Sequence, residues 1–352
     1  MAETKKPFPF WDYVAGIPVI CDYLTNDYPK LYGVTASYWV FLVPPSLLGI
    51  SIGLFRIGTL ISMLSAAAFL CLNLYGCYKV LKTTSFFLVI WGRNRQSAFP
   101  EALKIVAERL QDGRMIRQPK FDLYLPPPKT KLGQDSKIPK IPNGMVFMPG
   151  ALVEHNAYAS LASRLADEGI PVIVVNLEPR RLAIRHLGGN ASNIKYMIKS
   201  ASDLMSQSNK ISHHCNVQCW SVAGHSMGAY CLTDLIECLV PIGITKMILM
   251  GSHFMRRDLS YLNPRLKVLV LHASNDGFYF RNQTKDIFFS RLPKDTTNVY
   301  LIEGGNHAGF APHYGPQNLD KERTISAEEQ QTACIQAICG FLSIKEKASK
   351  VD

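Results

Sequence analysis

Residues 224–228 read Gly-His-Ser-Met-Gly, and this pentapeptide constrains the fold more than any other part of the chain. It follows an apolar segment, 220–223, with the pattern of a strand, and the residues after it are typical of a helix. A serine between a strand and a helix must occupy a sharp turn. Gly224 and Gly228 would let the neighbouring backbones pass without a clash of Cβ atoms. The pattern therefore predicts a strand–turn–helix unit that exposes the Ser226 hydroxyl; the alternative is a glycine-rich turn around a buried serine.

From Gly144 onward, segments with a strand pattern alternate with segments with a helix pattern. The run PVIVVN at 171–176 is continuously apolar, as expected for a strand buried on both faces. Such alternation predicts an α/β fold with a mostly parallel, doubly wound sheet. A capping box of Ser326 and Glu329 marks the start of the last helix. The expected strands are 145–148, 171–176, 217–222, 246–250, 266–271 and 298–302, and the expected helices are 156–168, 191–206, 227–238 and 326–341.

Two polar residues follow later strands. Asp276 comes after the strand at 266–271, and His307 comes after the strand at 298–302. Because ligands bind at the carboxyl ends of the strands in open α/β sheets, both side chains belong to the same edge as Ser226. A nucleophilic serine needs a base, and the base needs an orienting carboxylate, here in the order expected after this pentapeptide. The sequence thus predicts a catalytic triad of Ser, Asp and His at these positions.

Other residues near these strand ends have simpler explanations. Asp258 also follows a strand, but its Arg-Arg-Asp setting is typical of a solvated surface. Glu303 is too close in sequence to His307 to be its partner. Three more histidines are expected to pack or to form hydrogen bonds around the site: His225, His253 and His272.

An oxyanion formed at Ser226 needs two main-chain N–H donors. The N–H of Met227, directly after the serine, is the first candidate. The second is expected in the loop after the first strand, where Gly150 allows a close approach of the backbone. We favour the N–H of Ala151, with Leu152 as the alternative; an ordinary Pro-Gly β-turn is the other interpretation of this loop.

The stretch 34–78 contains a single charged residue, Arg56. Within it, residues 57–78 are 22 uncharged residues, and about 20 apolar residues suffice to cross the hydrocarbon core of a bilayer. Residues 38–55 are also apolar but contain two adjacent prolines, so they suggest a hairpin arm or an interfacial segment. Residues 1–95 are therefore predicted to anchor the chain in a membrane; the alternative is a buried helix pair of a soluble domain.

Basic residues near a span mark its cytoplasmic side. Four of them follow the predicted span: Lys79, Lys82, Arg93 and Arg95. Both a single span and a hairpin then place the C-terminal domain in the cytosol. Two glycosylation sequons, at 190–192 and 282–284, point weakly the other way.

Residues 96–143 are expected to connect the anchor to the catalytic domain at 144–345. An amphipathic pattern predicts a helix at 100–117. A stretch rich in proline, lysine and glycine follows, with one short strand near 121–125.

The net charge of +11 suggests an anionic partner, but the basic residues are scattered and form no nucleic-acid motif. Membrane lipids are the expected partner, and no nucleic acid is expected. Cys215 and Cys219 lie near His213 and His214, yet no second ligand pair with zinc-finger spacing follows. The nine cysteines are expected to be mostly reduced, and neither a metal nor another cofactor is expected.

Four segments resemble the α/β-hydrolase family 5, which is related to the dienelactone hydrolases and carboxylesterases. They are PGALVEHNAYASLASRLADEGIPVIVV at 149–175, GHSMGA at 224–229, NDG at 275–277, and GGNHAGFAPHYGPQNLD with TISAEEQQ at 304–331. The resemblance covers about residues 100–345 and implies the α/β-hydrolase fold and the same triad of Ser226, Asp276 and His307. Two departures stand out: Ala229 replaces a usual glycine, and Asn-Leu-Asp-Lys at 318–321 replaces a usual Gly-Asp-Gly.

These features together predict a membrane-anchored serine hydrolase that cleaves carboxylic esters, including lipid esters, through an acyl-enzyme. An acyltransferase with the same triad is one alternative. A catalytically silent binding protein with this fold is another, although such proteins typically lose a triad residue and none is missing here.

Overall fold

The computed structural model describes residues 67, 70–71, 97–128, 140–178, 181–183, 189–207, 216–252, 255, 257–277, 282–315 and 320–343. The chain divides into two compact units, Met1–Arg95 and Gln96–Asp352, and the fold and the site below belong to the second. Apart from three residues, the predicted span at 57–78 lies outside the described residues, as does the arm at 38–55. No helix within the described ranges combines the length and the apolar character that crossing a bilayer requires.

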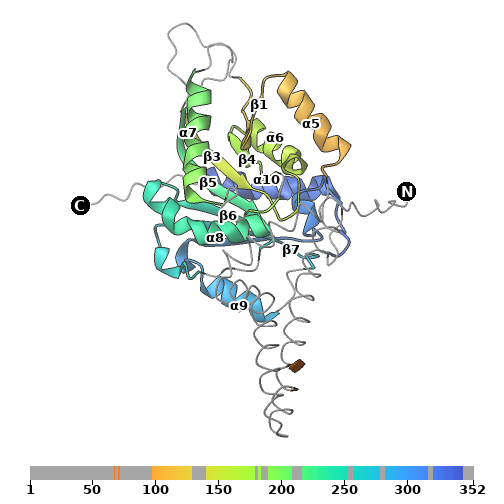
Figure 1. The fold of residues 1–352 in the computed structure, drawn as a ribbon, viewed down its shortest axis with the longest axis vertical. Helices are drawn as coiled ribbons and strands as arrows, with labels where there is room; N and C mark the ends of the chain where they lie inside the picture. Colours follow the sequence, from red (N-terminus) through yellow and green to blue (C-terminus); the bar gives the residue numbers. More distant parts are fainter. Residues whose placement is uncertain are drawn as a thin grey trace, which may run out of the picture. The chain divides into compact units, whose positions relative to one another are not determined.

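The described strands of the second unit form one eight-stranded sheet in the order β1-β2-β4-β3-β5-β6-β7-β8 (Figure 1). β1 pairs with β2, and β2 with β4, in antiparallel fashion, and all other pairs are parallel. The predicted mostly parallel α/β sheet is therefore confirmed. The strands are β1 Met115–Gln118, β2 Phe121–Tyr124, β3 Lys140–Met148, β4 Val172–Val175, β5 Asn216–His225, β6 Lys246–Met250, β7 Lys267–Ala273 and β8 Thr297–Ile302.

Helices cover both faces of the sheet. Alternate side chains of β3 enter two different cores: Met145 and Phe147 pack with α5, α6 and α10, whereas Val146 and Met148 pack with α7, α8 and α9. In Figure 1, α5 and α6 lie on one side of the strands and α7 and α8 on the other. The helices are α5 Pro100–Gln111, α6 Ala159–Asp167, α7 Ala191–Gln207, α8 Met227–Leu239, α9 Asn282–Ser290 and α10 Ala327–Ser343, with short 3-10 helices η4 His155–Tyr158, η5 Val240–Ile242, η6 Ser260–Leu262, η7 Lys294–Thr296 and η8 Ala308–Phe310.

The capping box predicted at the start of α10 is confirmed. The main-chain N–H of Ser326 donates to Glu329 Oε2 at 2.7 Å, and the N–H of Glu329 donates to Ser326 Oγ at 3.1 Å. β6 has the predicted bounds, and the other predicted strands are found with ends shifted by a few residues. The helix α9 has no counterpart in the sequence prediction.

The predicted helix at 100–117 is wrong in its last turns. α5 ends at Gln111, and Gly113 follows with a φ of 72°, a conformation that stops a helix. Met115–Gln118 then forms β1 and pairs with β2. The sheet of the second unit therefore begins before Gly144, within residues that the sequence assigned to a connector.

The buried carboxylate of Asp122 on β2 connects β1, β2 and η4 at the antiparallel edge of the sheet. Arg117, directly opposite on β1, donates from Nε and Nη2 to both carboxylate oxygens at 2.9 and 2.7 Å. His155 of η4 contacts the same carboxylate at 3.1 Å, and Arg117 also donates to Asn156 at 2.8 Å. Burial opposes ionisation of Asp122 most strongly, but the hydrogen bonds from His155 and Arg117 outweigh it and lower the pKa of the carboxyl group.

We expect Asp122→Asn to lower the free energy of unfolding at pH 7 by about 2 kcal/mol, since it weakens hydrogen bonds to a buried charge. Because the pKa is lower in the folded state, the anion stabilises the fold above the unfolded-state value of about 3.9, and this contribution disappears as the pH falls through the folded-state pKa. Urea unfolding at a series of pH values measures the free energy of unfolding of the wild type and of Asp122→Asn. The difference between the two proteins should become smaller below about pH 4.

Asp167→Asn is the matched control. Asp167 pairs with Arg109 at 2.7 Å but is 41% exposed, so the loss should stay below about 1 kcal/mol. If Asp122→Asn and Asp167→Asn lowered the free energy of unfolding equally, burial of the Asp122 carboxylate would not account for its contribution.

Candidate active site

Ser226 lies in the turn between β5 and α8. Its φ of 53° and ψ of −120° place a non-glycine residue in a sparsely populated region, which costs on the order of 1–3 kcal/mol. The turn is held from both sides: the N–H of Ser226 donates to the carbonyl of Met250 at 2.8 Å, and its carbonyl accepts the N–H of Tyr230 at 3.0 Å. The strained conformation is thus stabilised by β6 and by the first turn of α8.

The glycines on either side of Ser226 are required by close packing. A Cβ atom at Gly224 would lie 2.6 Å from the main-chain nitrogen of Ala229. A Cβ atom at Gly228 would overlap the carbonyl oxygens of Met148 and Pro149. Any larger residue at these positions would push α8 away from β3, so the serine would lose its position.

Asp276 and His307 form a buried pair. Asp276 follows β7 and His307 follows β8, and their side chains are 0% and 1% exposed. His307 Nδ1 lies 2.8 Å from Asp276 Oδ2. Because an ionised carboxylate only accepts hydrogen bonds, Nδ1 carries the proton, and Nε2 is the ring atom that can take up another.

The serine turn and the histidine meet at the carboxyl ends of the parallel strands. The ring centroid of His225, which precedes Ser226, lies 4.6 Å from that of His307. Gly251, at the end of β6, lies so close that a Cβ atom there would stand 3.0 Å from His307 Nδ1. The structure therefore brings the three predicted triad residues to one edge of the sheet.

A buried tyrosine, which the sequence did not indicate, joins this turn to the loop after β3. The hydroxyl of Tyr158 accepts the N–H of Gly150 at 2.8 Å and lies 2.8 Å from His225 Nδ1. Burial raises the pKa of Tyr158, so the hydroxyl keeps its proton and shares a hydrogen bond with His225 Nδ1. Burial, followed by the nearby His307, lowers the pKa of His225 well below its usual value. His225 is therefore neutral, and if Tyr158 donates to Nδ1 the ring proton is on Nε2.

In the same loop, the two candidates for the second oxyanion donor differ in their hydrogen bonding. The N–H of Leu152 is already bound to the carbonyl of Arg181 at 2.7 Å, and Leu152 has a φ of 65°. Among the described residues, the N–H groups of Ala151 and Met227 have no hydrogen-bond acceptor. Of the two candidates in this loop, the N–H of Leu152 is thus occupied and that of Ala151 is not. The assignment of Ala151 and Met227 as oxyanion donors stays a prediction.

The residues that were set aside as alternatives have other roles where the structure describes them. Asp258 accepts hydrogen bonds from the N–H and the hydroxyl of Ser260, the first residue of η6, at 2.9 and 2.6 Å. His272 is buried against the rings of Phe288 and Phe289. His253 lies outside the described residues.

No group of three or more His, Cys, Asp or Glu side chains with the arrangement of a metal site occurs within the described part of the chain. Cys219 is an exposed free thiol. The neighbouring residues of the metal alternative, at 213–215, lie outside the described ranges.

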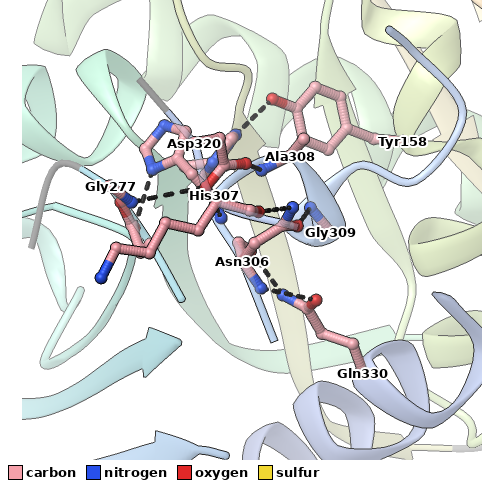
Figure 2. A network of polar contacts seen from close by, with 11 residues as sticks. Tyr158, Gly277, Asn306, His307, Ala308, Gly309, Asp320 and Gln330 are labelled. Carbon is pink, nitrogen blue, oxygen red and sulfur yellow. Dashed lines mark hydrogen bonds and ion pairs between the residues drawn. The ribbon is translucent and has the colours of Figure 1, made fainter. Parts of the chain in front are cut away.

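Asp320, in the loop that departs from the family pattern, is a further site residue. Its carboxylate accepts the N–H groups of His307 and Ala308 at 2.9 and 2.7 Å (Figure 2). On the other side of the histidine loop, the side chain of Gln330 binds both the N–H and the carbonyl of Asn306, at 3.1 and 2.7 Å. The only signal in the sequence was an aspartate shortly after the predicted base.

The model of the alpha/beta hydrolase family matches residues 144–332, more than half of the chain. No curated protein matches the sequence. Among solved structures, the chain is similar to the substrate-bound fluorophosphonate-binding serine hydrolase F of Staphylococcus aureus, with 16% identity, a TM-score of 0.41, and coverage of 65% of this chain and 96% of that one. It is also similar to the dienelactone hydrolase of Anabaena variabilis, with 15% identity, a TM-score of 0.38, and coverage of 63% and 89%.

The protonation state of His225 can be tested directly. We expect its ring to remain neutral, with the proton on Nε2, at pH values near and below about 6.5, where an unperturbed histidine becomes protonated. Ring ¹⁵N chemical shifts of the labelled protein report both the charge and the tautomer. Titration of His225 near its ordinary value would contradict the assignment, and Tyr158→Phe, which removes the donor to Nδ1, should move the Nδ1 shift.

Proposed function

Because the chain belongs to the alpha/beta hydrolase family, we propose that it is a serine hydrolase that cleaves carboxylic esters through an acyl-enzyme on Ser226. The observation that carries this proposal is the buried hydrogen bond between His307 and Asp276 beside the strained serine turn. A histidine whose Nδ1 is bound to a carboxylate is oriented to act as a base through Nε2.

In the proposed reaction, Ser226 Oγ attacks the ester carbonyl while His307 Nε2 takes its proton. Asp276 holds the imidazole in the required tautomer and stabilises the imidazolium that forms. His307 then returns the proton to the leaving alcohol. Water, activated by the same nitrogen, attacks the acyl-enzyme and releases the carboxylic acid.

The negative oxygen of the tetrahedral intermediate is proposed to bind the N–H groups of Met227 and Ala151. Met227 begins α8, so the favourable end of the helix dipole also faces the oxyanion. The hydrogen bond from Gly150 to Tyr158 supports this assignment, because it fixes the main chain directly before Ala151. The donors would then be in place before the substrate arrives, and this preorganisation is what makes such a site effective.

Ser226→Ala should abolish labelling by a fluorophosphonate probe and lower kcat for a p-nitrophenyl ester by about 10⁴-fold or more, because the covalent route is lost. Ser260→Ala, which changes a partly exposed serine of η6, is the matched control and should label like the wild type. Equal labelling of wild type and Ser226→Ala would refute the proposed nucleophile. A folded wild type that neither labels nor hydrolyses the ester would refute the proposed activity.

We further propose that residues 57–78 anchor the enzyme in a membrane, with the catalytic domain on the cytosolic face. The support is in the sequence: 22 consecutive uncharged residues followed by basic residues. An enzyme held at a bilayer has access to lipid esters, and these are the substrate class that we propose. The net charge of +11 favours attraction to the anionic lipids of a cytosolic leaflet.

Protease protection tests the orientation. In sealed vesicles with the cytosolic face outward, a C-terminal epitope should be removed by added protease without detergent, and both sequons should remain unmodified, so that glycosidase leaves the mass unchanged. A lumenal marker protein, cleaved only after detergent is added, is the control. A protected C-terminal domain would contradict the cytosolic assignment, and release of the protein by alkaline carbonate would contradict the anchor.

A further inference from the structure

Asp320 lies where the loop after β7 and the loop after β8 meet. Its Oδ1 accepts the N–H of His307 at 2.9 Å and lies 3.4 Å from the N–H of Gly277, and its Oδ2 accepts the N–H of Ala308 at 2.7 Å. Figure 2 shows the carboxylate between these main-chain donors. The side chain of Asp320 therefore contacts both Gly277, which directly follows Asp276, and His307.

The residues after Asp320 bind the same two loops. Lys321 donates its N–H to the carbonyl of Asn275 at 3.2 Å and accepts a hydrogen bond from the side chain of Asn306 at 2.8 Å. The carbonyl of Glu322 accepts a hydrogen bond from the side chain of Asn275 at 2.9 Å. Segment 320–322 thus holds the two loops in a fixed register, and Asp320 is the member of the segment that contacts His307 itself.

The charge of Asp320 acts on the same histidine as Asp276. Burial raises the pKa of Asp320; the N–H groups of Ala308 and His307 and the charge of His307 oppose this rise, and the charge of Asp276 adds to it. His307 is therefore placed between two carboxylates, one at its ring and one at its main chain. In a buried site, charges interact more strongly than in water, and the charges of Asp320 and His307 interact here.

We propose that Asp320 is a positioning residue of the active site, which fixes the main chain at His307 and supplies a second negative charge to the imidazolium formed during acylation. This inference rests on the proposed function, since it concerns the same proton transfer. Asp320 acts through His307 and does not contact the substrate in this scheme. The two contributions, geometry and charge, can be separated by substitution.

Asp320→Asn should leave the protein folded, because other contacts also hold the histidine loop. Gln330 binds Asn306, and Gln331 donates to the carbonyl of Gly309 at 2.9 Å. The amide of the variant keeps one acceptor oxygen but loses the charge, and its NH₂ group faces a main-chain donor. Thermal unfolding of the full chain checks that the variant is folded.

The deciding experiment is the pH profile of ester hydrolysis by the full-length enzyme. For Asp320→Asn we expect kcat to fall roughly 10- to 100-fold with KM within about twofold of the wild type, because the base is displaced while substrate binding is retained. The acid limb of kcat/KM should move to lower pH by about 0.5–1 unit, since loss of a nearby anion makes the imidazolium easier to deprotonate. A purely structural role would lower kcat without moving this limb.

Two variants sharpen the result. Asp320→Glu keeps the charge, so its acid limb should stay at the wild-type position even where kcat falls. Asp258→Asn changes another aspartate that binds a main-chain N–H, that of Ser260, and should keep the wild-type kcat and the wild-type position of the acid limb. If Asp320→Asn does not fold, the test rests on Asp320→Glu. An acid limb of kcat/KM that moves to lower pH by about 0.5 unit in Asp320→Glu, which keeps the charge, would overturn the role of the charge.

Suppose that hydrolysis depends on Ser226 but folded Asp320→Asn keeps the wild-type kcat and the wild-type acid limb of kcat/KM. That result would overturn the inference and leave the proposed function standing. A wild type without Ser226-dependent hydrolysis would instead overturn the proposed function, and the inference would fail with it.

Discussion

The site depends on a single steric constraint, the close approach of α8 to the ends of β3 and β5 around Ser226. The carbonyls of Met148 and Pro149 occupy the space that a Cβ atom at Gly228 would need, and Ala229 does the same at Gly224. Only glycine permits this approach, and the approach forces Ser226 into its positive φ. The N–H of Met227 and the hydroxyl of Ser226 thereby lie at the edge of the sheet where His307 and Asp276 also lie.

The parts of the molecule that were predictable from the sequence are those governed by local pattern and by the order of elements. The pentapeptide implies its own turn. The placement of Asp276 and His307 at the edge that also holds Ser226 was predictable because parallel strands end at a common edge. The capping box of α10 and the bounds of β6 follow from local chemistry in the same way. The helix end near residue 112 was mispredicted because the predicted helix was extended beyond Leu110, the last apolar residue at helical spacing. Gly113 and the pairing of β1 with β2 end the helix.

The parts that were not predictable are long-range contacts between a side chain and a distant main chain. Tyr158 binds His225, 67 residues later in the chain, and Asp122 binds His155, 33 residues later. No periodicity marks such residues, because each one satisfies a single donor or acceptor whose position depends on the whole fold. Asp320 was visible as part of a departure from the family pattern, but its role appears only when the two loops are seen side by side in Figure 2.

These contacts share a physical reason. The reacting groups lie on loops, where the main-chain N–H groups have no helix or strand to bind them, and buried N–H groups without acceptors are costly. Tyr158 supplies the acceptor for the loop before Ala151, and Asp320 and Gln330 supply acceptors for the loop around His307. By contrast, the N–H groups of Ala151 and Met227 have no acceptor among the described residues. Donors left unsatisfied within otherwise satisfied loops are preorganised for an incoming negative charge, so satisfying the surrounding main chain and preparing the site for catalysis are here the same structural task.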